Sequence, residues 1–535
     1  MELINQHTKK IMEDCKLKAR DTGLSFDNET LEYIVTNRDM IELSPKVMIP
    51  TLYDYWVNDV EVLKETGKYK LYPHNPYETV INSRPAISFY NDNNPDWMNI
   101  MIFYHVIGHI DFFQNNVLFE NTWKDDFVGM ALADKRLIEN LRSEHGRWVD
   151  YVIEFSRSID NITGFYKELP KKDFPTDMNI SDRLQFYFDN FLQEYAKYSK
   201  HAVYKEIERY NVLISENKEM GESMFFSEVK NKFPEFQLKY ENYKKNESNY
   251  TDLLLFIRQN SPLLNKEKNK WMKLVMTIIR NTSIYFGPQM RTKIINEGWA
   301  SYWHDKLFRY DDRIKGYEVA YSKLNAGVTS ISKIGLNPYA IGLRLIEHVE
   351  DLANKGKISS YFQNINDIEK RENYNKNTKT GKDAIFKLRS DFSDFMLVNT
   401  FTDQDFIDKH NLFVVGERFN QQKGVVEYYI KSKKNKDYKQ MLIDSLYHPP
   451  VINVDISKTS DDQLYLVHIF EGKQLYKQYI SDTMLGLEFL WGGSVKLETT
   501  EIYVDKQKST PNKNVFVYVK VLYTMLNKKL TKTNI

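Results

Sequence analysis

The chain has 535 residues, of which 42% are hydrophobic and 14% aromatic, a content sufficient for several hydrophobic cores that excludes an intrinsically disordered protein. Lys and Arg total 74 against 73 Asp and Glu, so the overall charge does not indicate nucleic acid or an anionic membrane as the main partner. The single cysteine, Cys15, excludes an intrachain disulfide and a thiolate metal cluster, as is common in a reducing cytosol.

The N-terminal stretch "MELINQHTKKIMEDCKLKAR" is charged throughout and contains no apolar core of a signal peptide. Nowhere in the chain do about 18 apolar residues follow one another, the length that a membrane-spanning helix needs. We therefore expect a cytoplasmic protein without a membrane span.

The first element that the pattern indicates is an extended strand, "YETVINSRPAISFY" at 77–90, in which Pro85 favours an edge position. A long helix is predicted directly after it. Asn94 is a suitable N-cap, Pro95 suits the first helical position, and Asp96 complements the positive end of the helix dipole.

Helical periodicity continues over residues 128–200. Residues 215–252 are polar and rich in Lys and Asn, and we predict a loop or a loosely packed insertion there. Helices are predicted again after this segment, with a pause at Gly287-Pro288, and a further helix is expected from Pro338.

The pattern changes near residue 397 from mainly helical to rich in strands, as in "NLFVVGERF", "GVVEYYIKS", "QLYLVHIF" and "SVKLETTEIYVD". We predict an α+β protein with a mainly helical domain at 1–396 and a smaller α+β domain at 397–535. Because the second domain has no evident group of catalytic residues, a binding or assembly role is its simplest interpretation. The first domain is expected to hold any metal by itself.

The helix after the strand carries "FYHVIGHIDFF", in which His105 and His109 are one turn apart. Their imidazoles lie on one helix face about 6 Å apart along the axis, so both can bind one ion. A pair of this kind is also common without a metal, as part of a core. The second segment, "INEGWASYWHDKL", contains Glu297, an acid in an apolar helix that needs a cation as its partner. Zinc accepts Glu297 as a third ligand and leaves a fourth position for water or substrate.

His304 follows Glu297 on nearly the same helix face but about 10.5 Å further along the axis. This distance favours a role in orienting a ligand or substrate, or in acid–base catalysis, over direct ligation. Asp111 and Glu78 are further candidates for a catalytic proton acceptor.

Asn82, Asn115 and Asn116 are candidates for contacts with a ligand imidazole or with a substrate amide. For Asn115 and Asn116, a cap at the end of the helix is an equally good interpretation. We assign structural positions to His145, His348 and Tyr339.

The stretches "YETVINSRPAIS", "HVIGHIDFFQNN", "MRTKIINEGWASYWHDKL" and "NPYAIG" are similar to those of the SpoVR family, the stage V sporulation protein R family, in the same order. The resemblance implies a cytoplasmic bacterial protein that is linked in spore formers to assembly of the peptidoglycan cortex. In bacteria that do not form spores, it implies an association with a stress-linked serine kinase system.

The segment "NEGWASYWH" also resembles the helix of gluzincin aminopeptidases that supplies the third zinc ligand after an H-E-x-x-H helix and an edge strand. This resemblance implies a zincin-like first domain with zinc at His105, His109 and Glu297, although iron or manganese remains an alternative. Val106 stands where those enzymes have the catalytic glutamate.

Two functions follow as hypotheses. The protein is either a metal-dependent hydrolase or transferase acting on amide bonds of a peptide or a peptidoglycan-related substrate, or a non-catalytic scaffold with a structural metal. In the second case, a protein partner, such as the serine kinase system, would bind the C-terminal domain.

Overall fold

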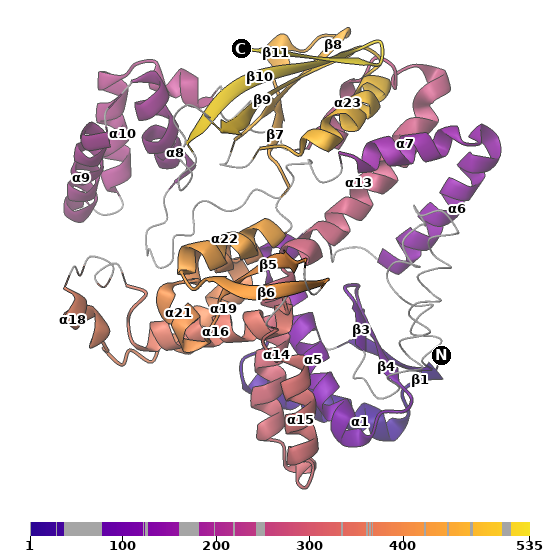
Figure 1. The fold of residues 1–535 in the computed structure, drawn as a ribbon, viewed down its shortest axis with the longest axis vertical. Coiled ribbons are helices and arrows are strands. Elements are labelled where there is room, and N and C mark those ends of the chain that lie inside the picture. Colours follow the sequence, from indigo (N-terminus) through magenta and orange to yellow (C-terminus); the bar gives the residue numbers. More distant parts are fainter. Residues whose placement is uncertain are drawn as a thin grey trace.

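The structure is a computed structural model that describes residues 2–27, 29–36, 78–120, 122, 127–159, 181–196, 198, 200–217, 220–241, 252–332, 335–359, 362, 365, 367–421, 424–446, 449–470, 474–504 and 515–535. Among these residues, helices predominate and small sheets accompany them (Figure 1), which confirms the predicted α+β class. Their buried hydrophobic side chains form three cores.

The first core contains the helix with the two histidines and the helix with Glu297. Its helices are α1 (Gln6–Asp21), α5 (Asp96–Asn115), α14 (Lys293–Arg309), α15 (Glu318–Val328), α16 (Pro338–Asn354), α19 (Gly381–Asp391), α20 (Asp394–Phe401), α21 (Gln404–Lys409) and α22 (Asn435–Ser445). The short 3-10 segments η1 (Val117–Phe119) and η6 (Asp312–Ile314) also belong to it. Helix α16 begins at Pro338, as predicted, with Asn337 as its N-cap.

A small sheet lies against this core, with its described strands in the order β1 (Glu2–Leu3), β2 (Thr30–Val35), β4 (Ala86–Asn91) and β3 (Glu78–Ile81). Strands β2 and β4 are parallel, whereas the other neighbours are antiparallel. The segment 77–90 is therefore not one strand, as predicted, but the antiparallel pair β3 and β4. The chain turns between them at residues 82–85, because Pro85 lacks the N–H that a continuous strand would need.

The second core joins helices from the middle of the chain to the C-terminal sheet. It contains parts of α6 (Phe127–His145), α7 (Trp148–Arg157), α12 (Leu253–Asn260), α13 (Lys270–Arg291) and α23 (Lys477–Trp491). Its described strands follow the order β11 (Lys529–Asn534), β10 (Phe516–Leu526), β9 (Ser494–Val504), β8 (Gln463–His468) and β7 (Ile452–Val454). Only β8 and β9 are parallel among these pairs, and α23 connects them.

Helix α13 runs from the second core towards the first (Figure 1). Its first half buries Val275 and Ile279 in the second core, and near its other end the Tyr285 hydroxyl donates a hydrogen bond to the Asn82 carbonyl. The predicted pause at Gly287-Pro288 is displaced, because the helix continues through Pro288 and ends at Arg291.

The polar segment at 215–252 is not the loop that its composition predicts, because its described part is mainly helical. Helices α9 (Lys200–Asn217) and α10 (Gly221–Lys232) pack with the π-helix Phe186–Tyr195 around the third core. Phe225, Phe226 and Val229 of α10 are buried, while mostly polar residues are exposed, including Lys230, Asn231 and Lys232 at its end. The polar composition of the segment therefore reflects the exposed side of the helix, and the aromatic residues of its buried side were not recognised as a helical pattern.

The predicted boundary at 396/397 falls inside α20, whose Leu397 and Val398 are buried in the first core. The first core continues to Leu442 on α22, and the second core resumes at Ile452. Residues beyond 396 thus complete the core that surrounds the histidines. The expectation that residues 1–396 hold a metal by themselves stays a prediction, and such a fragment would lack part of this core.

The strands predicted after residue 397 are confirmed, since β5 (Val414–Asn420), β6 (Val425–Ser432), β8 and β9 lie where the pattern places them. Within the described part of the chain, no helix has an apolar stretch long enough to cross a lipid bilayer.

Helices α5, α14 and α16 approach one another unusually closely through glycines. A Cβ atom added to Gly108 of α5 would lie 2.8 Å from the Cα of Ala300 on α14. Between α14 and α16, a Cβ on Gly342 would lie 2.0 Å from the Ile294 carbonyl oxygen, and one on Gly298 would lie 2.3 Å from the Gly342 carbonyl carbon. These distances are too short for any side chain, so glycine is required at both sides of the α14–α16 contact.

Replacing Gly342 with alanine is therefore expected to destabilise the first core by about 2 kcal/mol or more, because two helices must move apart. Gly327 on α15 is a matched control, since a Cβ there would meet no atom within 4 Å. Gly327→Ala should leave the free energy of unfolding within about 1 kcal/mol of the wild-type value. Thermal unfolding followed by circular dichroism measures both, and equal stability of the two variants would refute the close packing.

Candidate metal centre

Helix α5 presents His105 and His109 from consecutive turns at the inner side of the first core. The helix begins at Asp96 with Pro95 as its N-cap, one residue later than the predicted Asn94. The two imidazole rings are 4.6 Å apart between centroids and almost perpendicular. Only 6% of the His105 side chain and 9% of the His109 side chain are exposed.

Helix α14 presents Glu297 to the two histidines, and a distant residue fixes where this helix starts. The carboxylate of Asp394 on α20 accepts hydrogen bonds from the backbone N–H groups of Ile294 at 2.9 Å and Ile295 at 2.8 Å. A carboxylate at this position satisfies otherwise unpaired N–H groups and complements the helix dipole. Asp394 thus holds the first turn of α14 immediately before Glu297.

The three side chains are arranged as ligands of one ion. Oε2 of Glu297 lies 3.5 Å from Nε2 of His109 and 3.8 Å from Nε2 of His105, and one ligand atom from each residue lies within 4.8 Å of the others. In a tetrahedral site with bonds of about 2.1 Å, ligand atoms are about 3.4 Å apart. The observed separations are close to this value, so the donor set fits a divalent cation.

The protonation states also suit a cation. Burial lowers the pKa of His105 to about 3, against the opposing effect of the Glu297 carboxylate, so the imidazole is neutral at pH 7. Burial alone would raise the pKa of Glu297, but its contacts with His105 and His109 outweigh this effect and lower it. Neutral imidazole and ionised carboxylate are the forms that bind zinc.

A chain of hydrogen bonds determines the tautomer of His105, that is, which of its two ring nitrogens carries the proton. Nδ2 of Asn325 donates to the Asp305 carboxylate at 3.1 Å, so Oδ1 of Asn325 faces Nε2 of His304 at 3.0 Å and accepts from it. Nδ1 of a neutral His304 then accepts from Nδ1 of His105, 2.9 Å away. The lone pair of His105 is therefore on Nε2, the nitrogen that faces Glu297.

His304 contacts the side of the His105 ring that faces away from Glu297. Both nitrogens of His304 take part in hydrogen bonds. This position argues against the predicted catalytic role of His304 as a proton acceptor. It favours the other predicted role, in which His304 orients the His105 ring. His109 is oriented similarly, because its Nδ1 lies 2.9 Å from Oδ1 of Asn296.

Tyr339 belongs to the site, although we predicted a structural position for it. Its ring stacks on His105 with centroids 6.0 Å apart, and its hydroxyl donates a hydrogen bond to the Glu297 carboxylate. Asn296 and Asn325 were also missed. Asn296 and Tyr339 stand inside the quoted motifs "NEGW" and "NPYAIG", which was the available signal, whereas no pattern marked Asn325.

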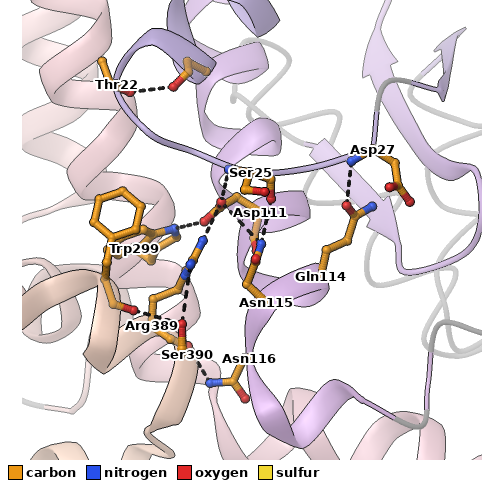
Figure 2. Close-up of polar contacts among 12 residues, drawn as sticks. Thr22, Ser25, Asp27, Asp111, Gln114, Asn115, Asn116, Trp299, Arg389 and Ser390 are labelled. Carbon is orange, nitrogen blue, oxygen red and sulfur yellow. Dashed lines mark hydrogen bonds and ion pairs between the residues drawn. The ribbon is translucent and has the colours of Figure 1, made fainter. Parts of the chain in front are cut away.

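Asp111 is fully buried and is not placed as a catalytic base. Its carboxylate accepts hydrogen bonds from Ser25 N–H at 2.7 Å and Trp299 Nε1 at 2.9 Å, and pairs with Arg389 at 2.7 Å. Figure 2 shows Asp111 at the centre of this group, which joins α5 to α14, α19 and the segment after α1. The role of Asp111 is therefore to connect elements of the first core.

The predicted asparagines also make structural contacts. Nδ2 of Asn115 donates to the carbonyl groups of Ser25 and Asp111, and Nδ2 of Asn116 donates to the Arg389 carbonyl at 2.7 Å. Asn116 additionally caps the segment that follows α5.

Asn82 donates a hydrogen bond from its side chain to the Thr122 hydroxyl at 2.9 Å. Within the described residues, the hydrogen bonds of Asn82 do not involve His105 or His109. The side chain of Glu78 lies outside the described residues, and its catalytic role stays a prediction.

His145 and His348 lie away from the site, as expected. The ring of His145 stacks on Trp271, and His348 is buried with its Nε2 3.1 Å from the carboxylate of Asp403. Val106, next to the first ligand, is completely buried in the first core.

Residues 2–449 match the family described as "SpoVR like protein". The chain belongs to the SpoVR family. This match confirms the resemblance inferred from the motifs, and it covers the first core together with α6, α7, α12 and α13 of the second.

A relative in Escherichia coli (strain K12), the uncharacterized protein YcgB, is 22% identical to this SpoVR-family chain over 491 residues, which cover 87% of this chain and 86% of YcgB. No solved structure matches the chain. The similarity thus extends past residue 449 into the C-terminal sheet in at least part, since the aligned length exceeds the family match.

Replacing His304 with alanine is expected to weaken metal binding by about 10–100-fold without abolishing it, because His105 loses the residue that orients its ring. His348→Ala is the control, since it also removes a buried histidine, but one that pairs with Asp403. Competition with a zinc-binding dye measures both affinities. Complete loss of binding in His304→Ala would identify His304 as a ligand instead.

Proposed function

We propose that this SpoVR-family protein is a zincin-like metalloprotein that acts on amide or peptide bonds. The supporting observation is the meeting of two imidazoles and one carboxylate at distances suited to one ion. Zinc is the first candidate, with iron or manganese as alternatives. When bound, the ion would supply Lewis-acid catalysis by polarising the carbonyl oxygen of an amide.

Among the described residues, those around this donor set orient it but offer no evident proton acceptor. The polar side chains that contact the donor set include His304, Asn296 and Tyr339, and both nitrogens of His304 are engaged. Val106 cannot replace the glutamate of H-E-x-x-H enzymes. We therefore favour a reaction in which the substrate brings an amine nucleophile, which would make the protein a transferase, over ordinary peptide hydrolysis.

Family membership supports a place for this chemistry in assembly of the spore cortex, peptidoglycan or envelope in the cytoplasm. A peptide or a peptidoglycan precursor is the substrate class that we propose. The association of related proteins with a stress-linked serine kinase system supports a protein partner for the C-terminal region.

A second candidate function is a scaffold with a structural metal. The observation that favours it is the burial of the ligands, since Glu297 is the most exposed of the three side chains at 17%. A structural site is closed to substrate, whereas a catalytic one keeps an open position.

The purified protein is expected to contain about one zinc-type ion per chain. His109→Ala and Glu297→Ala should each empty the site, because two remaining donors bind weakly, and His145→Ala should retain the ion. Elemental analysis by mass spectrometry gives the ratio of metal to protein. Full occupancy in the double variant His105→Ala, Glu297→Ala would refute the assigned ligands.

The metal-loaded protein is expected not to hydrolyse unstructured peptides at rates typical of aminopeptidases, because a positioned proton acceptor contributes about 10²–10⁴ in rate. Fluorogenic peptides provide the assay, and rapid turnover would contradict our interpretation of Val106. Val106→Glu should lower the unfolding temperature, since Val106 is 0% exposed and its replacement buries a carboxylate. Val106→Gln separates the effect of size from that of charge.

A further inference from the structure

Strands β5 and β6 form a ribbon with an unusually exposed apolar surface. They pair with each other, and within the described part of the chain no third strand joins them (Figure 1). Phe419 on β5 is 65% exposed, and Val426, Tyr428 and Ile430 on β6 are 49%, 50% and 52% exposed. Isolated ribbons of two strands are only marginally stable in water, and an open edge can pair with another strand.

The strand register places these four residues on one face. Phe419 is opposite Val426, Glu417 is opposite Tyr428, and Val415 is opposite Ile430. Since paired residues in antiparallel strands point to the same side and alternate residues share a face, this side of the ribbon is almost entirely apolar. The other face carries Tyr429 over Gly416, and Glu427 beside Arg418.

We propose that the edge of β6 pairs with β6 of a second copy of this chain, in an antiparallel register centred on Tyr429. The result is a symmetric dimer with a continuous sheet of two ribbons. This inference is independent of the metal site and of the proposed reaction.

The apolar faces restrict the register. In antiparallel pairing around a two-fold axis, the apolar faces of both copies lie on the same side only when one residue of β6 lies opposite itself. With Tyr429 opposite itself, Tyr428 lies opposite Ile430 of the second copy. Both are apolar and half exposed in the single chain, so pairing places like surfaces side by side.

The charges select Tyr429 as the central residue. In this register Glu427 lies opposite Lys431 of the second copy, and the same pair occurs again across the axis, so both pairs are attractive. A register centred on Glu427 would oppose two carboxylates, and one centred on Tyr428 would give no pair of opposite charge. A register centred on Ile430 would place Glu427 opposite Lys433, which lies beyond the end of β6. Lys431 suits this role because the irregularity in the β5–β6 pairing leaves no β5 residue opposite it.

The first test is the mass of the full-length protein in solution, measured by sedimentation velocity. The wild type is expected to form a dimer that dissociates on dilution. Lys431→Glu should weaken it by about tenfold or more, because each attractive pair becomes a pair of like charges. Lys433→Glu, beyond the end of β6, makes the same charge change and should have no effect. A wild type that stays monomeric at high concentration would overturn the proposal.

Mixing two variants tests the register directly. Glu427→Lys alone should also weaken the dimer, but a mixture of Glu427→Lys and Lys431→Glu should form a mixed dimer, because each glutamate then faces a lysine. Failure of the mixture to associate, with both variants folded by circular dichroism, would refute this register.

A cross-linking experiment provides an independent measurement. Tyr429→Cys should form a disulfide between two copies on mild oxidation, since the two residues lie opposite each other. Val426→Cys should not, because its two copies would be about 20 Å apart along the strands. The native Cys15 is 0% exposed and does not interfere. Equal cross-linking of both variants would contradict a pairing centred on Tyr429.

Discussion

The close approach of α5, α14 and α16 is the constraint on which the rest of the structure depends. Histidine and glutamate side chains are short, so His109 and Glu297 can reach the same point only if their helices almost touch. Gly108, next to His109, provides this proximity because it faces Ala300 of α14, whereas Gly298, next to Glu297, allows the close approach of α16. Gly342 brings α16 equally close to α14, and Tyr339 at the start of α16 therefore lies next to His105. The motifs with the ligands therefore also contain the residues that allow the helices to meet.

The chemistry of this site follows from the burial that the packing causes. A carboxylate removed from water is costly unless a positive charge compensates it. The cation that we propose between Glu297 and the two imidazoles would supply this charge. The hydrogen bonds that fix the rings, from Asn325 through His304 and from Asn296, are already in place, so little reorganisation would accompany binding of the proposed ion.

The sequence predicted those features that depend on spacing within one element. The helix with His105 and His109 was predictable from the capping residues before it, and their spacing of four residues places them on one face. The position of Glu297 followed from a nine-residue motif. It could not predict contacts set by tertiary packing, such as Asn325 behind His304. Composition led to two wrong interpretations. The lysine and asparagine content suggested a loop where helices pack around Phe225. The strand-rich pattern after residue 397 suggested a new domain where the first core continues to Leu442.

The second core has a consequence for the order in which the protein acquires its structure during synthesis. Val149 and Ile153 of α7 are completely or almost completely buried in a core that α7 shares with α23 and with the strands that carry Leu464 and Val495. The ribosome makes α7 long before these strands, and contacts this distant in sequence form slowly. The apolar side of α7 is thus without its native partner while most of the chain emerges, and a chaperone that covers such surfaces would have its longest opportunity there.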